Sequence, residues 1–399
     1  MNWNKYSVDD RKIPGISGLA ILLIIVSLYI NSKLVLFLAC FFLTIVISNQ
    51  FYLKKAGNQL YFENVNEKSR LFVDDKGKWT LIFRNEGYPI LKGELKVYYD
   101  HFVGPEGEKP SSSLSLLNEI AIPFSIYSKQ TKQIIIPFSA KMRGISKIRK
   151  LEYHVPSLLG FGETVLESRY YLKQQAVVYP QPIPVKGLKE QISILQGENA
   201  VPFSVYEDRL GPLGTRDYVP SDSFNRINWK ASARKQALQT KIYEKISEKG
   251  LNIALNVSDG HSITSGLEKM ISCITEIAYY AFNKQIPYSL CINVRTAGST
   301  PFLYLPKGEG KEHLQKVLET LASISTQNTS VPYDLMLSFF NRHIAAQPFF
   351  IHAGIRTGDT NHMLQNVSKK GARLLDLKID QGHGLLCVLE FPQERRVLS

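Results

Sequence analysis

Charged, aromatic and small side chains follow one another most densely in residues 215–234. An arginine guanidinium holds a carboxylate through parallel hydrogen bonds, so these cations and acids could form either an ion network or a reactive site. A buried network must pair its charges whether or not it does chemistry, because an unpaired buried charge is costly. The candidate signature and partner-binding residues are Arg216, Asp217, Tyr218, Asp222, Arg226, Trp229 and Arg234.

Residue types in this stretch predict the local elements that position these side chains. Residues 216–218 alternate as in a short strand, and residues 220–223 are typical of a turn whose acid or serine can cap a following helical turn. Trp229 precedes the small residues 231–233, a composition that indicates an aromatic anchor pressed against a neighbour. We therefore expect Trp229 to be largely buried against the domain that follows.

The order Arg-Asp-Tyr, Asp, Arg-Ile-x-Trp and Ala-Ser-Ala-Arg, followed by Tyr243-Glu244 in an expected strand, resembles the signature of the family called domain of unknown function 58. Bacterial and archaeal members are often encoded beside MoxR-type AAA+ ATPases and membrane-anchored transglutaminase-like proteins. Two positions differ from the usual pattern, because Ser221 replaces a common glycine and Asn228 replaces a common aspartate. These replacements weaken the case for catalysis by the signature.

A second candidate site lies in residues 256–262, at the end of an apolar strand expected at residues 251–257. Ligands of an open α/β sheet bind beyond the carboxyl ends of its strands. The arrangement resembles a von Willebrand factor type A domain, whose metal-ion-dependent adhesion site begins with Asp-x-Ser-x-Ser. Here the aligned residues are Asn256, Ser258 and Gly260, so the leading carboxylate and one hydroxyl are missing. Since hard divalent cations need anionic oxygen ligands, we expect a degenerate site that holds no metal.

The same loop contains Ser258 and His261, a residue pair that in other proteins serves as nucleophile and base. Neighbours this close along a loop rarely face each other productively, and a Gly-x-Ser-x-Gly motif is absent from the sequence. Capping of the following helix is the better explanation for these polar residues. We expect no catalytic residues and no cofactor.

The composition limits the classes of function. A chain of 399 residues is long enough for two or three domains. Its formal net charge of +13 is spread along the chain, which favours a membrane surface over nucleic acid as the anionic partner. No zinc-like spacing, Walker loop or RNA-binding motif supports nucleic-acid binding. The four cysteines lie far apart among apolar residues, as buried reduced cysteines do in cytosolic protein.

Two apolar runs at residues 14–30 and 34–53 are each close to the ~20 residues that a bilayer requires. The short connection between them predicts a transmembrane helical hairpin over residues 1–55. Basic residues Lys5, Arg11 and Lys12 precede the pair and Lys54 and Lys55 follow it, whereas the connection holds a single lysine. The positive-inside rule therefore places both ends, and the bulk of the chain, in the cytoplasm.

Two domains are expected after the anchor. Residues 56–180 alternate with period two between turn residues, which predicts a β-sandwich with strands at residues 71–73, 79–83, 95–99, 134–138 and from 170 onward. A proline-rich connector follows at residues 180–184. Residues 181–399 then alternate strands with helices, which predicts an α/β domain, von Willebrand factor A-like, with a mostly parallel sheet.

The helix expected near residues 267–281 has the clearest pattern of that domain. Its apolar residues recur with the spacing of one helix face, namely Leu267, Met270, Ile271, Ile274, Ile277, Ala278 and Ala281.

The sequence thus predicts a membrane-tethered binding or adaptor protein, and the family resemblance implies that it works with a MoxR-type AAA+ ATPase and other membrane proteins in assembly or remodelling of protein complexes. The alternative is a hydrolase or metal-dependent enzyme centred on the Arg/Asp signature. The two hypotheses differ in geometry. An enzyme requires Arg216, Asp222 and Arg234 around an open cleft, whereas an adaptor requires only a closed, mutually paired network.

Overall fold

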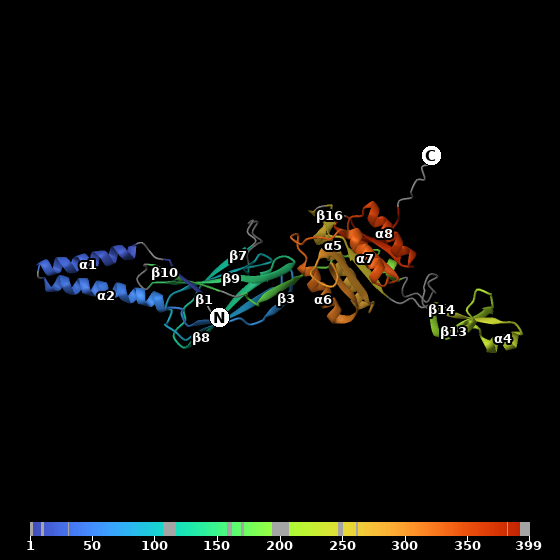
Figure 1. The fold of residues 1–399 in the computed structure, drawn as a ribbon, viewed down its shortest axis with the longest axis horizontal. Helices are drawn as coiled ribbons and strands as arrows, with labels where there is room; N and C mark the ends of the chain where they lie inside the picture. The colour runs from blue at the N-terminus through green and yellow to red at the C-terminus, as the bar shows by residue number, and fades with distance from the viewer. Residues whose placement is uncertain are drawn as a thin grey trace, which may run out of the picture. The chain divides into compact units, whose positions relative to one another are not determined.

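The computed structural model describes residues 3–8, 12–30, 32–106, 117–157, 162–168, 171–193, 207–245, 250–260, 262–380 and 382–391. Arg11, Tyr170 and His261, which the sequence singled out, lie outside these ranges. The chain divides into two compact units, Met1–Tyr179 and Pro180–Ser399 (Figure 1). The division lies one residue before the expected boundary.

The first unit begins with strand β1 (Trp3–Val8) and two consecutive helices, α1 (Lys12–Ile30) and α2 (Lys33–Lys55), which lie side by side (Figure 1). Among the described residues, α2 is the one helix that is long and apolar enough to cross a membrane. The apolar part of α1, residues 15–30, is shorter. Most side chains of α2 are exposed, unlike those of a helix in a soluble core.

Two sheets follow. The first contains, in spatial order, β1, β10 (Glu163–Ser168), β9 (Gly144–Pro156), β11 (Gln175–Tyr179) and β3 (Lys68–Phe72), with β5 (Glu94–Asp100) and β7 (Leu117–Pro123) attached through β9. The second contains β2 (Leu60–Glu63), β4 (Lys76–Asn85), β8 (Gln130–Ala140) and β6 (Val103–Gly104). Alternate residues of β4, β8 and β9 are buried, so the alternation in the sequence marks the inner face of each sheet.

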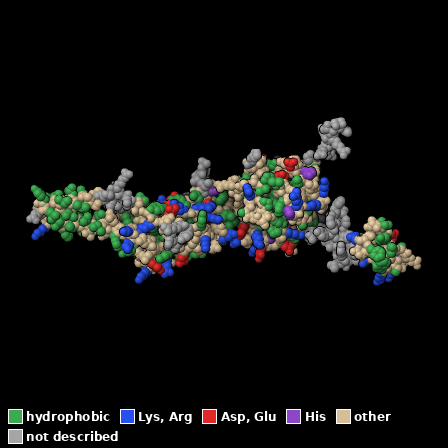
Figure 2. Space-filling model, in the orientation of Figure 1, with side chains coloured by type: hydrophobic (Ala, Val, Ile, Leu, Met, Phe, Trp, Pro, Cys, Tyr) green, Lys and Arg blue, Asp and Glu red, His purple; other side chains and the backbone are tan. Residues whose placement is uncertain are grey.

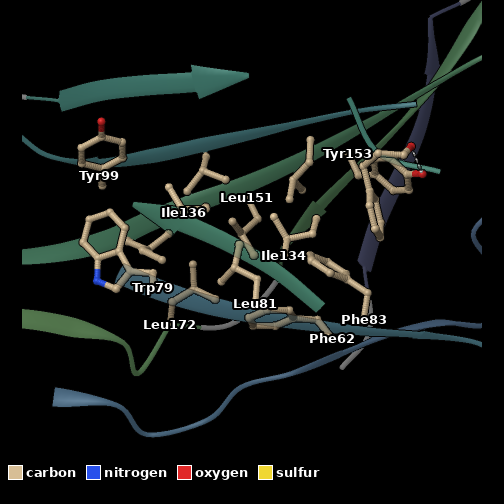
Figure 3. Packing of buried hydrophobic residues seen from close by; sticks show 14 of the residues in the cluster. Phe62, Trp79, Leu81, Phe83, Tyr99, Ile134, Ile136, Leu151, Tyr153 and Leu172 are labelled. Atoms are coloured by element: carbon tan, nitrogen blue, oxygen red, sulfur yellow. Dashed lines mark hydrogen bonds between the residues drawn. The ribbon is translucent and has the colours of Figure 1, made fainter. Parts of the chain in front are cut away.

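Aromatic side chains from both sheets fill the core of this unit (Figure 3). Trp79 is fully buried, with its ring 5.1 Å from Tyr99 and 4.3 Å from Phe138 between centroids. The Tyr153 hydroxyl donates a hydrogen bond of 2.9 Å to the Phe124 carbonyl, which satisfies a polar group that would otherwise be costly to bury. These aromatic residues are therefore core residues.

Strand β1 fixes the residues before α1 to the same unit as the residues after α2. It pairs antiparallel with β10, and the Trp3 indole donates a 2.8 Å hydrogen bond to the Leu60 carbonyl. Lys5 Nζ donates to the carbonyls of Lys54 and Ala56, at 2.8 and 2.7 Å, at the carboxyl end of α2. A cation there complements the helix dipole. Partial burial lowers the Lys5 pKa to about 8.

The second unit is built on one mixed sheet. Its strands run in the order β12 (Val185–Lys186), β22 (His383–Val388), β21 (Arg373–Asp380), β20 (Phe349–Ala353), β15 (Leu251–Leu255), β18 (Tyr288–Arg295) and β19 (Phe302–Gly308). The four strands from β21 to β18 are parallel, whereas β22 runs antiparallel to β21 and β19 runs antiparallel to β18. The short edge strand β12 is parallel to β22. Every residue of β15 and β20 is buried, so both faces of the sheet are covered.

Outside residues 207–245, the described helices of this unit are α3 (Leu188–Ser193), α5 (Leu267–Asn283), α6 (Gly310–Ser323), α7 (Tyr333–His343) and α8 (Gly358–Lys369). All seven residues of the apolar face expected in α5 are buried. Among the cysteines, Cys273 and Cys291 are buried as expected, but Cys40 is exposed on α2 and Cys387 is half-buried. Cys40 has apolar neighbours in the sequence, but its side chain is exposed because most side chains of α2 are exposed.

Candidate functional site

The signature residues lie in a small element that we call the signature module, defined as residues 214–245. Its frame is the antiparallel pair of β13 (Glu207–Asp217) and β14 (Gln239–Lys245). The connection between them contains a short 3-10 helix, η1 (Phe224–Arg226), and helix α4 (Trp229–Lys235). Figure 1 shows α4 beside the end of this hairpin.

Asp222 is the centre of a closed hydrogen-bond network. One carboxylate oxygen accepts from the Arg216 guanidinium, and the other accepts from the Val219 backbone N–H and the Thr240 hydroxyl, each at 3.1 Å. The hydrogen bond from Arg216 holds the pKa of Asp222 below its usual range. Through these donors the Asp222 carboxylate links β13, the turn after it and β14. This arrangement favours a structural role for Asp222 over that of a general base, which needs a free oxygen facing its substrate.

A second set of hydrogen bonds explains why an asparagine precedes the tryptophan. Asn228 is the N-cap of α4, and its side-chain oxygen accepts from the Ala231 N–H at 3.2 Å. The amide oxygen of asparagine caps a helix as well as aspartate does. The Ser232 hydroxyl donates to the Asn228 carbonyl and accepts from the Gln239 N–H, while the Gln239 amide donates to Asp217 at 2.6 Å. Helix α4 is thereby fastened to β14.

The expectation that Trp229 is buried is wrong. Its side chain is 58% exposed and lies edge-to-face with Phe224, itself 70% exposed, with ring centroids 5.6 Å apart. The anchor at this point is Ile227, which is 2% exposed, and the small Ser232 is buried through its hydrogen bonds instead of receiving the indole. The small residues after Trp229 therefore allow α4 to lie close to β14, and they do not form a pocket for the indole ring.

The other signature residues differ in environment. Tyr218 and Arg226 are half-buried, and Arg234 is exposed in the last turn of α4. The structure brings Arg216 and Asp222 together, but the expected partner Asp217 is held by Gln239. Sequence reasoning missed Phe224, Gln239 and Thr240. For Phe224 a signal was available, because it is a large apolar residue that directly follows the polar turn residues 220–223.

The second candidate site lies at the carboxyl ends of β15, β18 and β20. The order of the parallel strands reverses at β15, so this edge is the topological switch point where α/β sheets bind ligands. Asn256 follows β15 and Asn293 lies near the end of β18, and both side chains are buried. Ser258 begins a two-residue strand, β16 (Ser258–Asp259), which pairs with β17 (Ser262–Ile263).

A network of neutral groups occupies this edge. The Asn256 side-chain oxygen accepts from the Ser258 hydroxyl at 2.7 Å and from the Asn293 amide at 2.9 Å, while its own amide donates to the Ile355 carbonyl at 2.8 Å. The Asn293 oxygen accepts from the Val257 N–H at 2.7 Å. The side chains of Asn256, Ser258 and Asn293 are therefore joined by hydrogen bonds between neutral groups.

Neither the expected position Gly260 nor its neighbour Asp259 adds a carboxylate to this network. Asp259 is exposed on β16, and Gly260 has a φ of +61° in the turn to β17, a backbone conformation that suits glycine. Within the described ranges no group of three or more His, Cys, Asp or Glu side chains is placed to hold a metal ion. Sequence reasoning missed Asn293, whose position at the end of the next parallel strand was the available signal.

We predict that the full chain in detergent shows no saturable binding of Mg²⁺ or Mn²⁺ in isothermal titration at micromolar concentrations. Asn256, Ser258 and Asn293 carry no formal charge, so little offsets the dehydration of a small divalent cation. Saturable binding in the intact protein that disappears in Ser258→Ala would contradict this prediction and return a metal-dependent role to this edge.

Two ionisable pairs, each with a buried member on β20 or β21, were not identified from the sequence. The Tyr333 hydroxyl donates to His352 Nδ1 at 2.8 Å, and His352 Nε2 donates to the Gly354 carbonyl at 3.2 Å. Burial lowers the His352 pKa to about 4, so this histidine is neutral at physiological pH. Arg356 pairs with Asp376 at 3.3 Å, and burial raises the pKa of that carboxyl.

The architecture defines a two-unit protein in which a β-sandwich is followed by an α/β unit with a mixed sheet, and the α/β unit carries the signature module. Residues 214–377 match the family model described as Protein of unknown function DUF58, and this part of the chain belongs to that family. No curated protein matches the chain significantly in sequence.

Similarity to solved structures is low. Spo0M, a sporulation control protein from Bacillus subtilis, is 11% identical over 35% of this chain and 54% of its own, with a TM-score of 0.18. A putative membrane anchored protein from Corynebacterium diphtheriae is 13% identical over 34% of this chain and 39% of its own, with a TM-score of 0.20. PapD-like domain 7 of human CEP192 is 10% identical over 30% of this chain and 84% of its own, with a TM-score of 0.18. The chain thus spans about half of Spo0M and less of the Corynebacterium protein.

Proposed function

We propose that this protein is a membrane-tethered, non-enzymatic adaptor that presents its signature module to a partner protein. The observation that carries this proposal is the closed Arg216–Asp222 network together with the exposed pair of Phe224 and Trp229 in the same module. A closed ion pair fixes shape, and exposed aromatic rings provide contact area to a partner. The family resemblance implies a MoxR-type AAA+ ATPase as that partner, in assembly or remodelling of protein complexes.

The α/β unit is von Willebrand factor A-like in this proposal. Its support is the strand order β19-β18-β15-β20-β21, with α5 between β15 and β18, and the position of Asn256 and Ser258 directly after the central strand. The neutral groups at that edge favour a structural role over metal chemistry. The enzymatic alternative requires an open charged cleft, whereas Asp222 is engaged by Arg216 and Thr240.

The anchor is a transmembrane hairpin in this proposal. Strand β1 before α1 and strand β2 after α2 belong to one unit, and the Trp3 indole donates to the Leu60 carbonyl between them. If α2 crosses the bilayer, α1 must return across it, because its first residue connects back to β1. The apolar part of α1, residues 15–30, is short for a span, which some tilt of α2 or local thinning would accommodate.

We predict that alkaline carbonate leaves the protein in the membrane and that both chain ends are cytoplasmic. Lys5, Lys54 and Lys55 lie at the β1 end of the hairpin, and Lys33 alone lies at the other, so the positive-inside rule directs the two units to the cytoplasm. Protease added to intact cells should leave the chain uncut, and protease added to inverted vesicles should degrade it. Cleavage after Lys55 in intact cells would reverse this topology.

The adaptor role is tested by purifying the tagged protein from detergent-solubilised membranes and probing for the MoxR-type ATPase. We expect the ATPase with the intact protein and a clear loss with Arg216→Ala, because the substitution removes the main donor to Asp222. Arg84→Ala is the matched control, since Arg84 is an exposed arginine paired with Glu86 in the sandwich. Absence of the ATPase from the intact protein contradicts the proposed partner, and equal recovery with Arg216→Ala contradicts docking through the module.

A further inference from the structure

We propose that Phe224, Trp229 and the cations of α4 form one docking face for an acidic protein segment with an apolar anchor residue. This inference deepens the proposed adaptor function and rests on its assignment of the signature module as the docking surface. It adds the chemistry of the partner, which a closed structural network alone does not specify.

Apolar side chains are unusually exposed in the signature module. The exposed large apolar residues of residues 214–242 are Val219, Phe224, Trp229, Leu238 and Ile242. Figure 2 shows hydrophobic side chains gathered on the visible face of this module, with basic side chains at its edge. Large exposed apolar groups with a polar border are typical of protein-binding surfaces, and aromatic residues carry most of the binding energy in such surfaces.

The charge of the module selects an acidic partner. Residues 214–245 contain seven basic residues and three acidic ones: Arg216, Arg226, Lys230, Arg234, Lys235, Lys241 and Lys245 against Asp217, Asp222 and Glu244. Asp222 and Asp217 already accept hydrogen bonds inside the module. Lys230 and Arg234 are exposed one turn apart on α4, directly after Trp229. A segment that places an apolar side chain on the rings and carboxylates on these cations complements the face.

The fixed geometry favours a protein over a lipid surface. Asn228 caps α4, Ser232 and Gln239 join α4 to β14, and Ile227 is buried beneath the turn. These contacts fix the backbone that carries the two rings before binding, which reduces the entropy lost when a shaped partner docks. A fluid bilayer surface requires no such arrangement.

The test uses the full chain in phosphatidylcholine nanodiscs and a random peptide library displayed on phage. Peptides are first depleted on the double variant Phe224→Ala/Trp229→Ala in identical nanodiscs and then selected on the intact protein. We expect enrichment of peptides in which Asp or Glu flanks an aromatic or large aliphatic residue. Failure to enrich any peptide over the double variant, or enrichment of basic peptides, overturns the proposal.

Tryptophan fluorescence reports on the face directly. The chain has three tryptophans, and Trp3 and Trp79 are 9% and 0% exposed against 58% for Trp229. Acrylamide quenching of the intact protein therefore reads mainly Trp229, and the selected synthetic peptide should protect it. We expect Lys230→Glu/Arg234→Glu to weaken peptide binding at least about tenfold, with weaker binding at high salt. Lys311→Glu/Lys316→Glu on α6 is the control and should change affinity less than about twofold.

A membrane partner gives a different result. Nanodiscs that contain phosphatidylglycerol and brominated phosphatidylcholine quench a tryptophan that enters the bilayer, and quenching of Trp229 in them would overturn the proposal. The test also separates this inference from the proposed function. Selection of acidic peptides without recovery of the ATPase would contradict the ATPase as partner and support the docking face. Equal recovery of the ATPase with intact protein and with Phe224→Ala/Trp229→Ala would contradict the docking face and leave the adaptor function supported.

Discussion

Trp79→Ala is expected to lower the free energy of unfolding of the β-sandwich by about 3–5 kcal/mol, the usual cost of removing a large aromatic side chain from a packed core. The Trp79 ring is fully buried between Tyr99 and Phe138, which come from the two different sheets. Truncation leaves a cavity that β-strands tied into ladders on both sides cannot close. Urea unfolding of the full chain in mild detergent, followed by far-ultraviolet circular dichroism, measures the change.

Trp229→Ala is the matched control for this prediction. Its side chain is 58% exposed, so the same truncation should change the free energy of unfolding by about 0.5 kcal/mol or less. A loss of several kcal/mol for Trp229→Ala, or of under about 1 kcal/mol for Trp79→Ala, would reverse the assignment of the two tryptophans to surface and core. The pair of variants therefore also checks that Trp229 is available to a partner.

The stability of the α/β unit is expected to fall by about 3 kcal/mol as the pH drops from about 6.5 to about 4, because of His352. The folded state keeps this buried histidine neutral, whereas the unfolded state takes up a proton below its ordinary pKa of 6.5. The stabilisation is therefore complete above pH 6.5 and is lost as the pH falls toward the folded pKa. Arg356 adds to the effect, since its charge also disfavours a protonated His352.

His352→Gln removes the titrating group and should flatten this pH dependence in urea unfolding of the full chain. His362→Gln is the control, because His362 is exposed on α8, and it should leave the slope unchanged. Asp376 acts with the opposite sign near the acidic end of the range, since its folded pKa is raised and the folded state gains by protonating it. A slope that persists in His352→Gln would assign the acid sensitivity to other groups.

Local patterns in the sequence determined much of this fold. The apolar spacing in α5 predicted the buried face of that helix residue by residue, because a period of 3.6 identifies one side of a helix without reference to its neighbours. Period-two alternation located β4, β5 and β8 for the same reason. The dense charged stretch located the signature module, which falls within the matched family region. The two apolar runs marked α1 and α2.

Pairing between distant segments required the tertiary structure. Strand β1 joins β10 across more than 150 residues, and the six residues of β1 are too few to reveal a partner by their own pattern. The longest strand among the described residues, β9, pairs with β5, β10 and β11. An alternating pattern states which side chains are buried and does not state which strand lies beside them.

Tertiary structure also decided both candidate sites. The sequence placed Asn256 and Ser258 in one loop, but Asn293, which donates to both, comes from the neighbouring strand β18. Likewise, the Thr240 hydroxyl on β14 donates a hydrogen bond to Asp222. The residue types alone did not show whether Asp222 lies in a closed network or in an open cleft. Residue types specify which hydrogen bonds and ion pairs are possible. The path of the backbone specifies which of them form, and it left Trp229 at the surface because Ile227 and Ser232 already fill the contact with β14.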